Sequence, residues 1–119
     1  MSREIKFRGF QKTWIYGGIS VFENEATIFN VNCVANSAYE VDIKSIGQFT
    51  GLKDELGTEI FEGDILDFPF EMGIAYVIND GFRFAVKSPG SEAVDYEGES
   101  VLKCTRVIGN IYENPDLLT

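Results

Sequence analysis

Two carboxylates two positions apart, Glu62 and Asp64, come nearest to a catalytic spacing in this chain. On one strand they would share a face, where paired carboxylates can flank a glycosidic bond or hold a divalent cation. The 119 residues include no histidine, which excludes His-based acid–base catalysis, His-paired nucleophiles and His-ligated metal sites. No EF-hand, P-loop, Gly-x-Ser-x-Gly or dinucleotide fingerprint occurs. We therefore expect no enzyme activity, cofactor or metal, and interpret the pair as part of a bend at Gly63.

Acidic residues gather in two stretches, 54–71 and 92–99, that contain no basic residue. The formal net charge is −9, from ten basic and nineteen acidic residues. If the two stretches meet, they form an acidic interaction face that attracts basic proteins and repels nucleic acid. The candidates for this face are Asp54, Glu55, Glu59, Asp67, Glu71, Glu92, Asp95, Glu97 and Glu99. The alternative is that these acids form only the solvated surface that any soluble domain needs.

Two kinds of partner fit this charge. The first is a protein bound through the acidic face or a strand edge. The second is a basic DNA-binding protein that the chain would block by imitating nucleic acid, with a steep dependence on salt. Direct nucleic-acid binding is not expected, because the basic patch of Arg3, Lys6, Arg8 and Lys12 is small and the whole-chain charge opposes a polyanion. Self-association remains open, since small sheets leave edges to pair.

The cysteines and the N-terminal residues indicate in which cellular compartment the protein is expected. Cys33 and Cys104 form no Cys-x-x-Cys pair and lie among apolar residues, so we expect buried thiols rather than a disulfide or a reactive site. The first ten residues do not resemble a signal peptide, and no apolar run is long enough to cross a bilayer. We therefore expect a cytoplasmic protein without membrane contact.

Alternating apolar residues and close turn signals favour short antiparallel strands. Asn79-Asp80-Gly81 predicts a tight hairpin between 74–78 and 82–86, and Gly57 predicts a turn after Asp54. We expect a strand over 101–112, a solvated loop over 88–100 and one helical turn at 42–46. Together these elements favour a small antiparallel β barrel or sandwich.

Three segments carry distinctive motifs: 3–8 (REIKFR), 48–65 (QFTGLKD, a glycine at 57, EIFEGDI) and 107–118 (VIGNIYENPDLL). These segments resemble the YopX family of small phage and prophage proteins. The motif residues that we expect to shape the fold are Thr50, Gly51, Leu52, Asp54, Gly57, Glu62, Gly63, Asp64, Gly109, Asn110, Tyr112, Asn114 and Pro115. The resemblance implies a mainly β protein with an SH3-like barrel and no established activity, so it supplies no catalytic residues. It implies an accessory protein of a phage or prophage, which we expect to act by protein binding in the bacterial cytoplasm.

We expect one domain over residues 1–119. Its N-terminal strands would occupy 1–46, a barrel-like core 47–113 and a short tail 114–119. Gly63 and Gly109 are expected to allow a bend and a close backbone approach, and Asp64 to accept hydrogen bonds from turn amides.

Overall fold

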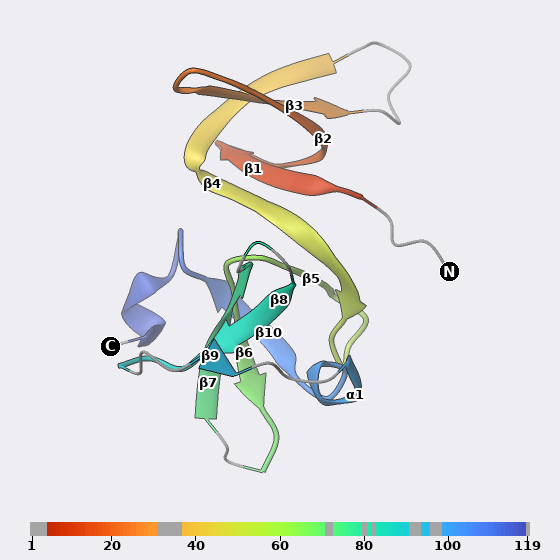
Figure 1. Cartoon of the computed structure of the whole chain (residues 1–119), viewed down its shortest axis with the longest axis vertical. Helices are drawn as coiled ribbons and strands as arrows, with labels where there is room; N and C mark the ends of the chain where they lie inside the picture. Colours follow the sequence, from red (N-terminus) through yellow and green to blue (C-terminus); the bar gives the residue numbers. More distant parts are fainter. Residues whose placement is uncertain are drawn as a thin grey trace. The chain divides into compact units, whose positions relative to one another are not determined.

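The computed structural model describes residues 5–30, 37–70, 73–79, 81, 83–90, 94–95 and 99–118. It consists mainly of antiparallel strands, which confirms the predicted fold class (Figure 1). The chain divides into two compact units, Met1–Phe49 and Thr50–Thr119, which are described separately below. The division lies three residues beyond the predicted boundary between 46 and 47. The organisation of both units as one domain stays a prediction.

Four strands build the N-terminal unit, and each pairs with two others. They are β1 (Phe7–Gln11), β2 (Thr13–Phe22), β3 (Glu25–Asn30) and β4 (Ser37–Lys53), the last of which continues into the second unit. Hairpins join β1 to β2, β2 to β3 and β3 to β4, and β1 also pairs antiparallel with β4. The pairings therefore close into a ring (Figure 1).

The interior of this ring is filled by alternate strand positions, as a two-residue period requires. Ala26, Ile28 and Val41 are buried, and Phe7 packs against them. A Cβ on Gly9 would lie 2.5 Å from the Cγ2 atom of Val41, so the glycine permits this close packing. Ile5, which precedes β1, is 74% exposed and lies outside this interior.

The C-terminal unit contains a five-stranded sheet in the order β10-β6-β7-β8-β9, while β5 pairs with β4. The elements are β5 (Glu59–Phe61), β6 (Asp64–Phe68), β7 (Gly73–Asn79), β8 (Phe84–Lys87), β9 (Val94–Asp95), the short helix α1 (Glu99–Leu102), β10 (Arg106–Asn110) and the 3-10 helix η1 (Pro115–Leu118). The sequence predicted a barrel-like core over 47–113, whereas the strand pairings that close into a ring are those of the N-terminal unit.

Cross-strand pairs build the core of the C-terminal unit. Leu66 is paired with Ala75, and Val77 with Val86, and all four are buried. Ile60, Phe68 and Leu102 complete the cluster. Burying aliphatic and aromatic side chains of this size stabilises the unit by roughly 1.5–3 kcal/mol each.

The predicted turns around Gly57 and Gly81 are confirmed. β7 and β8 form the expected hairpin, ending with Asn79 opposite Phe84. The Asn79 side chain accepts a hydrogen bond from the Gly81 N–H (2.9 Å), and Gly81 has a φ of 97°. Gly57 has a φ of 86°, a conformation that glycine adopts without steric cost.

Two local predictions are wrong. The helical turn at 42–46 is instead part of β4, because β1 pairs with this stretch, placing Phe10 opposite Asp42. The strand expected over 101–112 is shortened to β10, because α1 ends in a turn in which the Thr105 hydroxyl donates to the Leu102 carbonyl (2.7 Å). Most of the expected loop at 88–100 lies outside the described residues.

Candidate binding surface

The Asp54 side chain fastens the turn after β4 to β10. Its Oδ1 accepts hydrogen bonds from the N–H groups of Leu56 (2.9 Å) and Thr58 (2.8 Å). Its Oδ2 accepts from the N–H of Val107 (2.9 Å), fifty-three residues along the chain. One carboxylate therefore satisfies three backbone donors and fixes both the shape and the position of the turn.

These hydrogen bonds favour the charged form of Asp54. Burial raises the pKa of this carboxyl, but the N–H groups of Val107, Thr58 and Leu56 outweigh that effect, so the pKa is lowered from its ordinary 3.8. Only 6% of the residue is exposed. Asp54 therefore holds the fold together and is too covered to serve in an acidic interaction face.

The motif around Thr50 connects β4 to β5. The Thr50 hydroxyl donates to the Ile60 carbonyl (2.7 Å) and accepts from the Leu52 N–H (3.1 Å). Gly51 between them has a φ of 88°, so the strand bends at a residue that tolerates that conformation. Thr50 is 1% exposed, which gives it a structural role.

The Gly63-Asp64 pair forms the predicted bend before β6. Gly63 has a φ of 93°, and its carbonyl accepts the N–H of Ile111 (2.8 Å). Asp64 is 1% exposed, and its Oδ2 accepts the Phe61 N–H (2.7 Å). Glu62 lies in the turn ahead of β6, so it does not share a strand face with Asp64. This arrangement contradicts the geometry that an acid pair on one strand would need.

The closing motif forms a compact turn between β10 and η1. The Asn110 side chain accepts from the N–H groups of Tyr112 (3.1 Å) and Glu113 (2.8 Å), and the Asn110 N–H donates to the Asn114 side chain (3.2 Å). A Cβ on Gly109 would lie 2.6 Å from Asn114 Oδ1, so the group that approaches this glycine closely is a side chain. Pro115 then begins η1.

Few of the predicted acidic-face residues can be placed. Glu55 and Asp67 are exposed, and Glu59 is half-buried. Outside the residues described in full lie Glu71, Glu92, Asp95, Glu97 and Glu99.

The two units differ in net charge, which the net charge of the whole chain does not reveal. Residues 1–49 hold five basic and five acidic residues, whereas residues 50–119 hold five basic and fourteen acidic ones. The entire net charge of −9 therefore belongs to the C-terminal unit.

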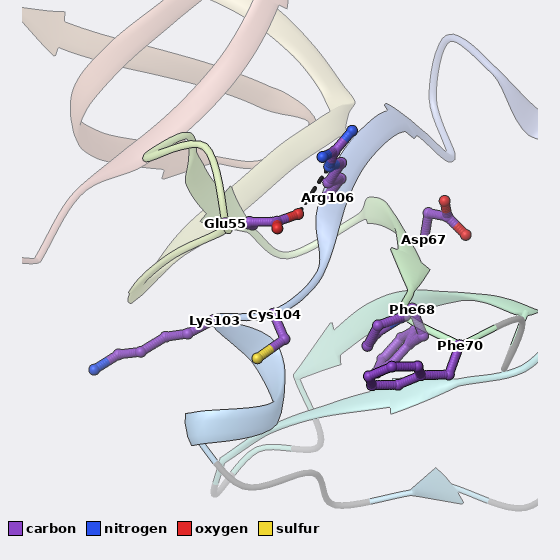
Figure 2. A pocket seen from close by; sticks show the side chains of 8 residues that line it. Glu55, Asp67, Phe68, Phe70, Lys103, Cys104 and Arg106 are labelled. Atoms are coloured by element: carbon purple, nitrogen blue, oxygen red, sulfur yellow. Dashed lines mark hydrogen bonds and ion pairs between the residues drawn. The ribbon is translucent and has the colours of Figure 1, made fainter.

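Glu55 and Asp67 line the same pocket on this unit, which we call the Phe70 pocket (Figure 2). It has a volume of about 410 Å³ and is lined by Glu55, Asp67, Phe68, Pro69, Phe70, Lys103, Cys104 and Arg106. The turn after β4, the end of β6 with the residues that follow it, and the connection from α1 to β10 supply these side chains. Three segments distant in sequence thus form one surface.

A second hollow, which we call the Lys53 pocket, adjoins the first. It has a volume of about 430 Å³ and is lined by Gly51, Leu52, Lys53, Asp54, Glu55 and Lys103. Glu55 and Lys103 line both pockets, so the two hollows form one continuous surface.

Phe70 is the most exposed large apolar side chain of this surface. It is 93% exposed and has a φ of 60°, a left-handed conformation that costs a non-glycine residue roughly 1–2 kcal/mol. Phe68, two positions earlier, is only 9% exposed. The sequence prediction missed Phe70. The available signal was the run Phe68-Pro69-Phe70, since a proline ends a central strand and leaves the next aromatic outside it.

An ion pair forms another wall of the Phe70 pocket. Arg106 Nε lies 2.8 Å from Glu55 Oε2 (Figure 2), and both side chains are about half exposed (56% and 51%). The hydrogen bond and the charge of Glu55 raise the pKa of Arg106, and Asp67, its partner across the strands, adds to this effect. The guanidinium charge is thus balanced locally by two carboxylates.

Cys104 lines the Phe70 pocket and is exposed, so the prediction of a buried thiol is wrong at this position. Its N–H donates to the Val101 carbonyl (3.0 Å) in the turn after α1, where Leu102 and Thr105 take the buried positions. Cys33 lies outside the described residues.

Among the residues described, no group of three or more His, Cys, Asp or Glu residues could hold a metal ion. In the same part of the chain, no helix combines the length and the apolar character needed to cross a bilayer.

Comparisons with known proteins agree with the sequence motifs. A family model described as "YopX protein" matches residues 6–119. The crystal structure of protein EF1440 from Enterococcus faecalis is similar, with a TM-score of 0.62 and 26% sequence identity. The similarity covers 99% of this chain and 100% of that chain, and it therefore extends over both units. The comparison with curated proteins gives no match.

Proposed function

This chain belongs to the YopX protein family, and from that premise we propose that it is a phage or prophage accessory protein that acts in the bacterial cytoplasm by binding another protein, without catalysis. The binding region is the surface formed by the Phe70 and Lys53 pockets. The motif residues of the family resemblance support this division of roles, because Asp54, Asp64 and Asn110 are engaged in backbone hydrogen bonds.

The single observation that carries the proposal is the exposure of Phe70. A phenylalanine that is 93% exposed in a left-handed conformation costs free energy twice, once through strain and once through contact with water. A partner that covers the ring would recover roughly 1.5–3 kcal/mol. Aromatic side chains, phenylalanine included, are enriched in the cores of protein interfaces.

The charge of the C-terminal unit favours a second candidate, the imitation of nucleic acid. All of the net charge of −9 lies in residues 50–119, which is the concentration such a role needs. A basic DNA-binding protein would then bind in a strongly salt-dependent way, because its affinity would come mainly from charge. Binding centred on Phe70 would depend less on salt, since burial of apolar surface is not screened.

The test is a pull-down from bacterial lysate with the tagged chain and with two variants. Phe70→Ala removes the proposed anchor. Phe22→Ala is the matched control, because Phe22 is also an exposed phenylalanine (74%) but lies in the N-terminal unit. We expect the parent chain and the Phe22→Ala variant to capture the same partner, and the Phe70→Ala variant to lose it.

Each other outcome decides against the proposal. If the parent chain and both variants capture the same DNA-binding protein and release it at moderate salt, the result would support the nucleic-acid mimic. Recovery of only the tagged protein's own copies, with self-association measured by light scattering and unchanged in Phe70→Ala, would indicate a homo-oligomer. Direct binding of single-stranded DNA would contradict both candidates, and turnover of a substrate would contradict the absence of catalysis.

A further inference from the structure

The few basic residues of the C-terminal unit are concentrated at the candidate binding surface. The unit has five of them, and three line the two pockets: Lys53, Lys103 and Arg106. The remaining two are Arg83 and Lys87. In a unit with fourteen acidic residues, this gathering marks a local departure from the surrounding negative charge.

Two acidic residues of the surface bond within the chain, and a third lies opposite a basic residue. Glu55 is paired with Arg106 at 2.8 Å, and Asp67 stands opposite Arg106 across the strands. Both oxygens of Asp54 accept backbone N–H groups. Lys53 and Lys103 are exposed and line the Lys53 pocket, so their ammonium groups are the basic hydrogen-bond donors at this end of the surface. An ammonium has three donors, so Lys103 can hold a carboxylate in addition to any contact within the chain.

The two ends of the surface differ in chemistry. The Phe70 pocket offers the apolar groups of Phe68, Pro69 and Phe70, whereas the Lys53 pocket offers ammonium groups. Lys103 lines both, and Figure 2 shows its side chain on the opposite side of Cys104 from the two phenylalanines, extending away from them. A ligand that fills both pockets must therefore carry an apolar group at one end and an anionic group at the other.

We propose that the two pockets bind a peptide segment of a partner protein in which an apolar side chain lies next to a carboxylate. The apolar side chain packs against Phe70, and the carboxylate bonds to Lys53 and Lys103. This inference rests on the proposed function and specifies its ligand. It also supplies selectivity, because the negative charge of the rest of the unit repels acidic chains that lack the apolar anchor.

The test uses three synthetic peptides that differ at one position: acetyl-Gly-Phe-Glu-Gly-amide and its analogues with Gln or Lys in place of Glu. Binding to the isotope-labelled full chain is followed by amide chemical shifts. We expect the Glu peptide to shift the amides of residues 51–56, Phe68, Phe70 and residues 103–106. We expect the Gln analogue to bind about three- to tenfold more weakly, which is the effect of losing exposed ion pairs.

Variants separate the two ends of the surface. Lys53→Gln combined with Lys103→Gln is expected to abolish the difference between the Glu and Gln peptides while leaving the Gln affinity unchanged. Phe70→Ala is expected to weaken both peptides by about tenfold or more. Lys44→Gln is the charge control, since Lys44 is an exposed lysine of β4 in the N-terminal unit, and it should change nothing.

The outcomes distinguish the inference from the proposed function. Equal affinity for the Glu and Gln peptides, or preference for the Lys peptide, would overturn the inference that the ligand carries a carboxylate. The proposed function would still stand in that case if protein capture depends on Phe70. The inference would also be overturned if a millimolar concentration of peptide changed the amide chemical shift of no pocket residue. Loss of the Phe70 dependence of protein capture would refute the proposed function itself.

Discussion

Replacement of Asp54 by asparagine tests the structural centre of the C-terminal unit. The new amide nitrogen must take the place of one carboxylate oxygen. If it replaces Oδ2, it faces the Val107 N–H, so two donors meet and one hydrogen bond is lost. The opposite orientation loses the bonds from Leu56 and Thr58 instead, which is worse.

The magnitude follows from the chemistry of the bonds. A hydrogen bond to a charged group contributes roughly 1.5–3 kcal/mol, and Asp54 is almost fully buried, so solvent compensates little. We expect Asp54→Asn to lower the free energy of unfolding by about 2–3 kcal/mol. For a chain of this size, that corresponds to a fall in Tm of roughly 6–15 °C.

The dependence on pH has a defined sign. The pKa of Asp54 is lower in the folded state than its ordinary 3.8, so its stabilisation is complete above that pH and is lost as the pH falls through the folded pKa. The difference in stability between the parent and Asp54→Asn should therefore shrink below about pH 4.

The assay is thermal unfolding followed by circular dichroism over a range of pH, together with amide hydrogen exchange. Exchange at Val107 should accelerate in the variant, whereas exchange at Ile28 in the N-terminal core should not. An unchanged Tm at neutral pH, or a stability difference that grows in acid, would refute the reasoning about this carboxylate.

Three further substitutions test other local arguments. Gly63→Val places a β-branched residue at a φ of 93° and should cost roughly 1–3 kcal/mol, and an unchanged Tm would exclude the bend. Gly109→Ala brings a Cβ within 2.6 Å of Asn114 Oδ1 and should cost about 1–3 kcal/mol by displacing that side chain; a chemical denaturation curve identical to the parent's would contradict it. Phe70→Asn should leave Tm unchanged or raise it by a few degrees, because asparagine tolerates the left-handed conformation; a marked fall in a thermal shift assay would mean that the ring supports the fold.

The sequence predicted the local structure well where one short segment decides it. Asn79 and Gly81 form the expected hairpin turn, and Gly57 and Gly63 have the positive φ that their turns require. Asp64 accepts the turn amide that the motif suggested. Each of these features depends on residues within a few positions, so their chemistry could be inferred without the fold.

The candidate site was predicted poorly because its parts are distant in sequence. Asp54 was expected both to shape the fold and to belong to an acidic face, and its third hydrogen bond comes from Val107, which no local pattern indicates. Cys104 was expected inside because its neighbours are apolar, yet the turn after α1 gives the buried position to Thr105. Phe70 was not considered, since its exposure depends on where β6 ends.

The amino-acid sequence alone determined the strand content, the glycine turns, the family motifs and the lack of any histidine-based chemistry. The tertiary structure decided the closure of β1 onto β4, the burial of Asp54 and the joining of Phe70, Lys103 and Glu55 into one surface. The physical reason is the range of the interactions. Turn geometry and side-chain alternation are set by neighbours in the chain, whereas pairing between distant strands and the exposure of a side chain depend on which segments pack together.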